Sequence, residues 1–204
     1  MRSFDNLKKI SMLKSDQSYK INNESIELLN LANNIKKNSN ILELGAGSGF
    51  LSIALEKFND IKVIDSYEIN LSSYNLLIKN IKKNKCKKIN SILGNFNELD
   101  SVNNYNKYDF IISNPPFYKK NSGRLPMNDI NKAGKYEIYT DMKKILSLAA
   151  NLLKNKGVFL FCYPSFREGE ILKNIRGKPI FMKLKIVKKL IRKKICYYKL
   201  IKII

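Results

Sequence analysis

The fold is decided by residues 41–49, which read Ile41-Leu42-Glu43-Leu44-Gly45-Ala46-Gly47-Ser48-Gly49. An apolar run leads directly into a loop with glycine at every second position, and the apolar residues after the loop begin a helical pattern. Glycine lets the backbone turn sharply and approach a ligand without interference from a Cβ atom. We therefore predict a strand, a ligand-binding loop and a helix, which together form the first unit of an α/β sheet.

Apolar runs and helical patterns alternate along the chain outside this loop. The predicted strands are residues 41–44, 62–66, 89–93, 108–113 and 157–163, and the predicted helices are residues 22–37, 50–58, 71–83 and 141–154. Short buried strands separated by helices predict a parallel sheet covered on both faces. Two final apolar runs, residues 179–187 and 195–204, flank a basic turn at residues 188–194 and predict an antiparallel hairpin. The expected fold is α/β, a doubly wound, mostly parallel seven-stranded sheet that ends in this hairpin.

Length and composition exclude several classes of protein. The 204 residues suffice for a single domain, and no apolar run approaches the roughly twenty residues needed to span a bilayer. The chain has no histidine, which excludes Ser-His and Cys-His catalysis, and its three cysteines are too scattered to bind zinc. No signal peptide is evident at the N-terminus. We expect a cytoplasmic protein with free thiols, no metal and no membrane contact.

The chain is strongly basic, with 38 Lys and Arg against 17 Asp and Glu and a net charge of +21. Such a charge attracts polyanions. The A+T-rich codon usage implied by abundant Lys, Asn and Ile explains part of it, and that alternative stays open. Codon usage explains less well the clustering over residues 167–204, where thirteen Lys or Arg face two acids. Nucleic acid is the expected partner.

The spacing of the glycines indicates which ligand the loop binds. A dinucleotide loop, G-x-G-x-x-G, would place its third glycine at position 50, but Phe50 stands there and the third glycine is Gly49. A carboxylate at Glu43 would suit the cationic methionyl ammonium of S-adenosylmethionine, whereas it would repel a pyrophosphate. We therefore expect S-adenosylmethionine as cofactor, bound by the loop residues Glu43, Gly45, Ala46, Gly47 and Gly49.

Two later strand ends would complete the cofactor site. Glu68 follows the second strand and can accept hydrogen bonds from the ribose hydroxyls, as acids at this position do in dinucleotide folds. The alternative for Glu68 is an N-terminal acid on the helix that begins at Leu71. We prefer Glu68 to Asp65, which falls within the strand. After the third strand, Asn95 would bond the adenine amino group and Phe96 would pack on the ring.

The fourth strand ends in Asn114-Pro115-Pro116-Phe117, which we expect to carry the chemistry. Ligands bind at the carboxyl ends of strands in doubly wound folds, so this loop faces the cofactor. The side-chain oxygen of Asn114 and the carbonyl of Pro115 can each accept one N–H of an exocyclic amine and hold its nitrogen toward the sulfonium methyl. The two prolines stiffen the loop, and Phe117 offers a face for stacking the base. Asn114 also borders the cofactor. The alternative is a Pro-Pro turn that only ends the strand.

These motifs resemble a known group of enzymes. The segments ELGAGSG, YEIN, ISNPPF and LLIKNIKKN, which contains Asn80, look like class I N-methyltransferases acting on adenine, guanine or glutamine amides, whose fold is Rossmann-like. DQSYKINNESIELL looks like the Q-x-x-G-Y-R-x-x-x-D-S-x-L-L segment of the bacterial tRNA(Val) adenine N6-methyltransferases. KAGKYEIYTDMKKILSLAANLLKNKGVFLF looks like a further segment of that family. The resemblance covers roughly residues 16–163 and implies methylation of adenine N6 in tRNA.

The sequence departs from the family pattern at three points. Glu24 replaces an aspartate, Lys20 replaces an arginine, and residues 134–137 keep only the final acid, Glu137. The resemblance implies that residues 1–38, including Gln17, Tyr19 and Glu24, cover cofactor and substrate, and that residues 39–204 form the catalytic core. We interpret residues 117–135 as a substrate lid or, alternatively, as a solvated loop.

Four other functions remain open. A protein glutamine methyltransferase would present the same –NH2 geometry to Asn114, although such enzymes have an added N-terminal domain and only about forty residues precede the first strand here. A ribosomal RNA guanine N2-methyltransferase has a similar loop. A DNA adenine methyltransferase commonly carries a separate recognition region. A non-catalytic RNA-binding form of the fold is the fourth alternative.

Overall fold

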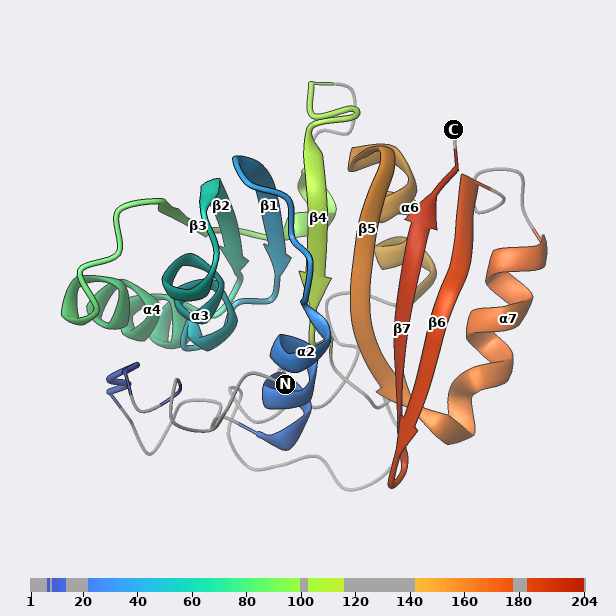
Figure 1. The fold of residues 1–204 in the computed structure, drawn as a ribbon, viewed down its shortest axis with the longest axis horizontal. Helices are drawn as coiled ribbons and strands as arrows, with labels where there is room; N and C mark the ends of the chain where they lie inside the picture. Colours follow the sequence, from blue (N-terminus) through green and yellow to red (C-terminus); the bar gives the residue numbers. More distant parts are fainter. Residues whose placement is uncertain are drawn as a thin grey trace.

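Figure 1 presents the structure, a computed structural model, with its central sheet running across the view. It describes residue 7 and residues 9–13, 22–99, 103–115, 142–177 and 183–203. The sheet has seven strands in the order β3-β2-β1-β4-β5-β7-β6. The strands are β1 (Ser39–Leu44), β2 (Ile61–Glu68), β3 (Ile89–Leu93), β4 (Tyr108–Ser113), β5 (Leu153–Pro164), β6 (Leu184–Arg192) and β7 (Ile195–Lys202).

The pairing of the strands confirms the predicted fold class. The first five strands in the chain run parallel to one another, and β7 pairs antiparallel with both β5 and β6. The sheet order reverses beside β1, because the chain adds β2 and β3 on one side and β4 and β5 on the other. In open α/β sheets this switch point is where ligands bind, at the carboxyl ends of the strands.

Helices cover both faces of the sheet (Figure 1). They are α2 (Asn23–Leu31), α3 (Phe50–Phe58), α4 (Leu71–Lys83), α6 (Met142–Leu152) and α7 (Glu168–Gly177), with 3-10 turns η1 (Phe96–Glu98) and η2 (Ser165–Arg167). One core packs α2 and α3 against alternate residues of β1, β4 and β5, and the other packs α6 and Ile171 of α7 against the opposite residues. This two-sided burial explains the apolar runs in the central strands β1, β4 and β5.

Several elements differ from the prediction, and the helix predicted to residue 154 ends at Leu152, directly before β5 begins. The first predicted helix ends at Leu31 instead of Lys37, because the backbone leaves the helical conformation at the C-cap residue Ala32, where ψ is 49°. The basic turn predicted at residues 188–194 is wrong in its extent, since β6 continues to Arg192 and only two residues separate it from β7. Helix α7 was not predicted, and glycines at both ends of this short polar segment weaken its helical pattern.

The basic hairpin turn lies at the same edge of the sheet as the glycine loop. Ile195 pairs with Pro164, the last residue of β5, and the backbone N–H of Ser165 donates to the carbonyl of Lys194 over 2.8 Å. Because β5 is parallel to β1, its end faces the same direction as Leu44. Lys193 and Lys194 are both exposed. The hairpin therefore carries positive charge to the edge where the strand-end motifs meet.

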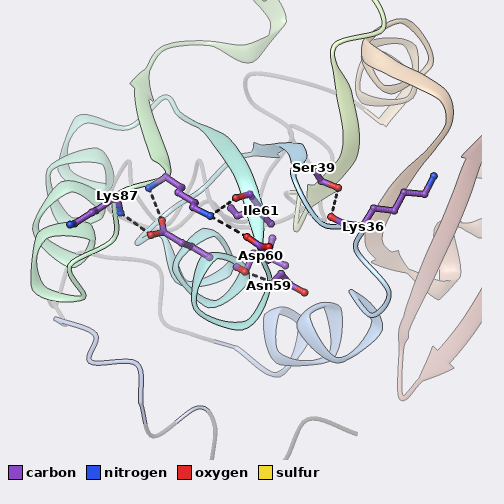
Figure 2. A network of polar contacts seen from close by, with 9 residues as sticks. Lys36, Ser39, Asn59, Asp60, Ile61 and Lys87 are labelled. Carbon is purple, nitrogen blue, oxygen red and sulfur yellow. Dashed lines mark hydrogen bonds and ion pairs between the residues drawn. The ribbon is translucent and has the colours of Figure 1, made fainter.

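The opposite edge of the sheet is tied by a polar network (Figure 2). Ser39 Oγ donates to the carbonyl of Lys36 over 2.6 Å, and Lys88 Nζ donates to the carbonyl of Ile61 over 2.6 Å. The carboxylate of Glu56 accepts the backbone N–H groups of Lys87 and Lys88 at 2.8 and 3.1 Å. These contacts stabilise the first residues of the strands, at the end of the sheet opposite the glycine loop.

Candidate active site

The glycine loop turns through three left-handed residues between β1 and α3. Gly45, Gly47 and Gly49 have φ values of 78°, 55° and 85°. The N–H groups of Gly45 and Ala46 both donate to the carbonyl of Tyr67, at 3.0 and 2.8 Å, which holds the loop against the end of β2. A left-handed conformation is costly for a residue with a Cβ atom, so glycine is favoured at these three positions.

Two of these glycines meet different surroundings. A Cβ atom built on Gly45 would have no heavy atom within 4 Å, whereas one on Gly49 would lie 2.3 Å from Cδ1 of Leu77. Gly49 is therefore required for packing of α3 against α4. The backbone at Gly45 is open, and a ligand can approach it closely. The predicted contact between Gly45 and S-adenosylmethionine needs such an open backbone, and the contact itself stays a prediction.

Glu68 joins the glycine loop to the start of α4. One carboxylate oxygen accepts the N–H of Gly47 over 2.7 Å, and the other accepts the N–H of Asn70 over 2.8 Å. Burial raises the pKa of Glu68, and the backbone hydrogen bonds partly oppose that effect. The N-cap of α4 is Asn70, whose side chain accepts the N–H of Ser73, so Glu68 does not cap this helix. The two oxygens offer about four acceptor positions, and the backbone N–H groups of Gly47, Ile69 and Asn70 use three of them, so one remains for a ribose hydroxyl.

Asp65 lies within β2 and its carboxylate is already satisfied. It accepts hydrogen bonds from Asn90, Lys107 and Tyr108 at 2.9, 3.0 and 2.7 Å. Burial alone would raise the pKa of Asp65, but these three hydrogen bonds and the charge of Lys107 outweigh it and leave the pKa below its usual value. The structure agrees with the prediction that Asp65 is a strand residue.

Glu43 is buried and faces two hydroxyl groups. Its carboxylate accepts a hydrogen bond from Ser52 Oγ, which also lies 2.6 Å from Ser66 Oγ. Burial raises the pKa of Glu43 to about 8, and the charge of Glu68 adds to the effect. The expected contact between Glu43 and a methionyl ammonium stays a prediction. A cation close enough to make it would favour the charged carboxylate.

Asn114 lies directly beside the glycine loop. Leu44 pairs with Ser113, and Ser113 Oγ donates to the carbonyl of Leu44 over 2.8 Å, so the residues after each strand, Gly45 and Asn114, are neighbours at the edge. Parallel strands lie about 4.8 Å apart, which is the distance expected between facing strand ends. Pro115 is buried at the start of the following loop.

The amide of Asn114 is held from two sides. Its Nδ2 atom donates to Ser25 Oγ over 3.0 Å and to Asn22 Oδ1 over 3.3 Å, both in the first turn of α2. Its Oδ1 atom accepts a hydrogen bond from Cys162 Sγ on β5 over 3.1 Å. Asn22 is the N-cap of α2, and the sequence indicated no site role for Asn22, Ser25 or Cys162.

The other predicted site residues are less fully described. Asn95 and Phe96 follow β3 at the same edge, and Phe96 is partly buried against the core that contains α6. Their contact with adenine stays a prediction. Several predicted residues lie outside the described part of the chain: Pro116, Phe117, Gln17, Tyr19, Lys20, Glu137 and the lid at residues 117–135.

Asn80 connects the glycine loop to the N-terminal segment. Its Nδ2 atom donates to the carbonyl of Ser48 over 2.9 Å, and its Oδ1 atom accepts the N–H of Leu13 over 2.7 Å. Asn84, one helical turn later, bonds both the N–H and the carbonyl of Ser11 at 3.0 and 2.9 Å. The sequence indicated Asn80 only as part of a motif, without these contacts.

Neither a metal site nor a membrane span is found where the structure is described. In those ranges no group of three or more Cys, Asp or Glu residues is arranged to hold a metal ion. None of the described helices combines the length and hydropathy needed to cross a bilayer.

A comparison with known families identifies this arrangement. The methyltransferase small domain matches residues 20–179, which include the glycine loop, Glu68 and Asn114. The chain belongs to the methyltransferase small domain family. Family and fold together confirm the predicted cofactor, S-adenosylmethionine, at the level of the class.

Proteins similar to this chain are named for different methyl acceptors. The chain is 33% identical over 130 residues to the release factor glutamine methyltransferase of Fusobacterium nucleatum, covering 60% of this chain and 36% of that one. It is 32% identical over 83 residues to the tRNA1(Val) (adenine(37)-N6)-methyltransferase of Christiangramia forsetii, covering 40% of this chain and 35% of that one. It is 29% identical over 161 residues to the enzyme of that name from Aliivibrio fischeri, covering 79% and 67%. The chain thus spans little more than a third of the length of the first two relatives.

Solved methyltransferase structures have the same fold as this chain. A putative RNA methyltransferase from Pyrococcus horikoshii superimposes with a TM-score of 0.64 and 20% identity, covering 97% of this chain and 95% of that one. The structure of M. jannaschii TYW2 in complex with AdoMet gives a TM-score of 0.59 and 18% identity, covering 95% and 80%. At these identities the likeness concerns the fold alone.

Proposed function

We propose that the protein transfers a methyl group from S-adenosylmethionine to the exocyclic N6 amine of an adenine in tRNA. The observation that carries the proposal is the adjacency of Asn114 and Gly45 at the switch point of the sheet, secured by the hydrogen bond between Ser113 and Leu44. A group that accepts hydrogen bonds thus lies beside a backbone cradle that is open to a ligand.

In this proposal the chain binds and orients the acceptor nitrogen. An amine conjugated to a purine is a weak nucleophile, because its lone pair is delocalised into the ring. Asn114 Oδ1 and the carbonyl of Pro115 would each accept one N–H of the amine. These two hydrogen bonds would keep the lone pair on the nitrogen, instead of delocalised into the ring, and would direct it toward the methyl group of the cofactor. The bound cofactor supplies an electrophilic sulfonium methyl group. The chain would hold the nitrogen in line while the N–CH3 bond forms and the S–CH3 bond breaks, and the methylated nitrogen would then lose one proton to solvent.

The cofactor would lie across the ends of β1, β2 and β3. The open backbone at Gly45 would accept the methionyl part, Glu68 would accept hydrogen bonds from the ribose hydroxyls, and Asn95 with Phe96 would flank the adenine. Asn80 on α4 would hold the glycine loop in place, because its side-chain amide donates a hydrogen bond to the carbonyl of Ser48. Residues 1–38 would cover the site, and the docking of Leu13 on Asn80 is consistent with that role.

The basic hairpin would bind the RNA backbone. Lys193 and Lys194 are exposed at the same edge of the sheet as Asn114. Lys188 and Lys199 are paired across the two strands, and a bound phosphate would reduce the repulsion between their charges. Burial lowers the pKa of Lys199, and the nearby charge of Lys188 lowers it further. Support for tRNA over other acceptors comes from the relatives named for adenine N6 methylation of tRNA1(Val).

A glutamine amide is the second candidate acceptor. It presents the same –NH2 group to Asn114, and the relative from Fusobacterium nucleatum, 33% identical over 130 residues, is named for that reaction. The basic hairpin favours the nucleic acid, since a glutamine side chain in a protein substrate has no need of a positive surface.

The test is a methyl-transfer assay with both acceptors. Purified protein is incubated with isotopically labelled S-adenosylmethionine and either pooled unmodified tRNA or a purified peptide release factor. Nucleosides and peptides are then analysed by mass spectrometry. The proposal predicts labelled N6-methyladenosine in the tRNA and no label in the protein. Label in a glutamine residue of the release factor, without label in tRNA, would contradict it and establish the second candidate.

A further inference from the structure

The orientation of the Asn114 amide follows from the chemistry of its neighbours. The backbone N–H of Ser25 donates to Asn22 Oδ1 over 2.9 Å. A backbone N–H is only a donor, so the atom of Asn22 that it meets is the carbonyl oxygen, which is only an acceptor. The same oxygen meets the Asn114 amide at 3.3 Å. The atom of Asn114 that faces α2 must therefore be a donor, which is Nδ2.

The two N–H groups of Asn114 are both occupied in this arrangement. One donates to Asn22 Oδ1 and the other to Ser25 Oγ. Ser25 is buried, with 8% of its surface exposed, and Cys162 on the other side is fully buried. Turning the amide by 180° would place its oxygen against Asn22 Oδ1, where two acceptors would face each other without a proton between them, an arrangement that buried polar groups avoid.

The oxygen of Asn114 is correspondingly held toward β5. Cys162 Sγ donates to Oδ1 over 3.1 Å, and burial, together with the charge of Glu24, raises the pKa of this thiol well above its usual value. The thiol therefore stays protonated at neutral pH and remains a weak donor. An amide oxygen has two lone pairs, so Oδ1 keeps one acceptor position in the described part of the chain.

We infer that Asn22 and Ser25 are positioning residues that make the site selective for an amine. Resting on the proposed function, the inference is that the first turn of α2 occupies both N–H groups of Asn114, so that only its oxygen is available to the acceptor. A free amide can bind either an amine or a carbonyl. An amide locked in this way accepts N–H groups and repels a carbonyl oxygen at the same position.

Ser25 offers the sharper test, because Asn22 also caps the helix. Ser25→Ala removes the acceptor of one Asn114 N–H, and Ser25→Thr keeps the hydroxyl. Loss of one neutral hydrogen bond in a positioning contact corresponds to roughly a 5–10-fold fall in kcat. We expect Ser25→Ala to lower kcat by this factor, with KM and Kd for S-adenosylmethionine within about twofold of the original values, and Ser25→Thr to restore most of it.

The matched control is Ser39→Ala. Ser39 is also buried and its hydroxyl also makes a hydrogen bond, but that bond goes to the carbonyl of Lys36 at the opposite edge of the sheet (Figure 2). Its removal should change kcat less than twofold. Melting temperatures of both variants, measured in parallel, separate a loss of stability from a loss of positioning.

Two assays distinguish this inference from the proposed function. Turnover is measured as N6-methyladenosine formed in pooled unmodified tRNA, and exchange of the Asn114 side-chain N–H protons is measured by NMR, with Asn114→Ala used to assign the signals. We expect slow exchange that Ser25→Ala accelerates at least severalfold. If the original protein methylates tRNA but Ser25→Ala leaves kcat and the exchange rate unchanged, the inference is overturned and the proposed function stands. If the original protein transfers no methyl group to any amine, both are overturned.

Discussion

Replacing single glycines of the loop with alanine separates a glycine that binds from a glycine that packs. Gly45 and Gly49 both have left-handed backbones, with φ values of 78° and 85°. They differ in what an added methyl group would meet, which is nothing within 4 Å at Gly45 and Leu77 Cδ1 at 2.3 Å at Gly49. The two substitutions therefore carry the same backbone cost but different steric costs.

The expected losses of stability follow from these two contributions. A left-handed conformation costs a residue with a Cβ atom about 1–2 kcal/mol, and this cost applies to both variants. Leu77 is fully buried and cannot move into solvent, so Gly49→Ala adds an overpacking cost of about 1–3 kcal/mol. We expect the melting temperature to fall by about 2–8 °C in Gly45→Ala and by about 4–20 °C in Gly49→Ala, at roughly 2–4 °C per kcal/mol for a chain of this size.

Binding of the cofactor should show the opposite order. A methyl group on Gly45 would occupy the space through which the ligand approaches the backbone. A steric cost of about 1–3 kcal/mol there would weaken S-adenosylmethionine roughly 5–100-fold. Gly49→Ala, measured well below its melting temperature, should bind the cofactor within a few-fold of the original protein.

Thermal unfolding and isothermal titration calorimetry on the same two preparations test this reasoning. Gly45→Ala should lose mainly affinity, and Gly49→Ala should lose mainly stability. If Gly45→Ala binds S-adenosylmethionine as tightly as the original protein, the open cradle at Gly45 is not the cofactor site. Equal falls in melting temperature would show that the contact with Leu77 is relieved without cost.

Three further variants test charges around the site. Burial raises the pKa of Glu43 from 4.5 to about 8, so between these pH values the folded protein keeps a proton that the unfolded chain releases. The contribution of this proton to the free energy of unfolding is fully present below pH 4.5 and is lost as the pH rises to 8. Glu43→Gln should therefore gain stability relative to the original protein, by a few kcal/mol, between pH 5 and pH 8 in chemical unfolding, whereas a constant difference would refute the shift. Glu68→Gln should weaken S-adenosylmethionine about 10–100-fold in calorimetry if the carboxylate bonds the ribose, and an unchanged Kd would remove that role. Replacing Lys193 and Lys194 with glutamine should reduce the slope of log K for tRNA binding against log salt concentration by about 2. An unchanged slope would mean that these two lysines do not bind RNA and that codon usage explains them.

The parallel part of the fold could be predicted because local patterns determine it. The run of apolar residues in β1, the alternate glycines and the apolar start of α3 are contiguous in sequence, and burial on both faces makes the strands recognisable. The bounds of β6 could not be predicted, because this edge strand exposes lysines such as Lys188 and Lys189. In the sequence a run of lysines resembles a polar turn more than a strand.

The contacts of the site could be predicted only where a motif includes them. Gly45, Glu68 and Asn114 follow strand ends, so the parallel topology alone brings them to one edge. The partners of the Asn114 amide are different. Ser25 and Asn22 are 89 and 92 residues away in sequence, and no periodicity links them to the fourth strand. The docking of Leu13 on Asn80, 67 residues away, is likewise a tertiary contact without a local signal.

The central claim is that Asn114 and the glycine loop form one site in which an amine receives a methyl group. Asn114→Ala tests it directly, since the substitution removes the acceptor oxygen and leaves the cradle at Gly45 intact. Single-turnover formation of N6-methyladenosine in tRNA should fall at least 100-fold, the effect of losing one preorganised group at the reacting atom, while the Kd for S-adenosylmethionine stays within about threefold. Turnover close to that of the original protein would contradict the account.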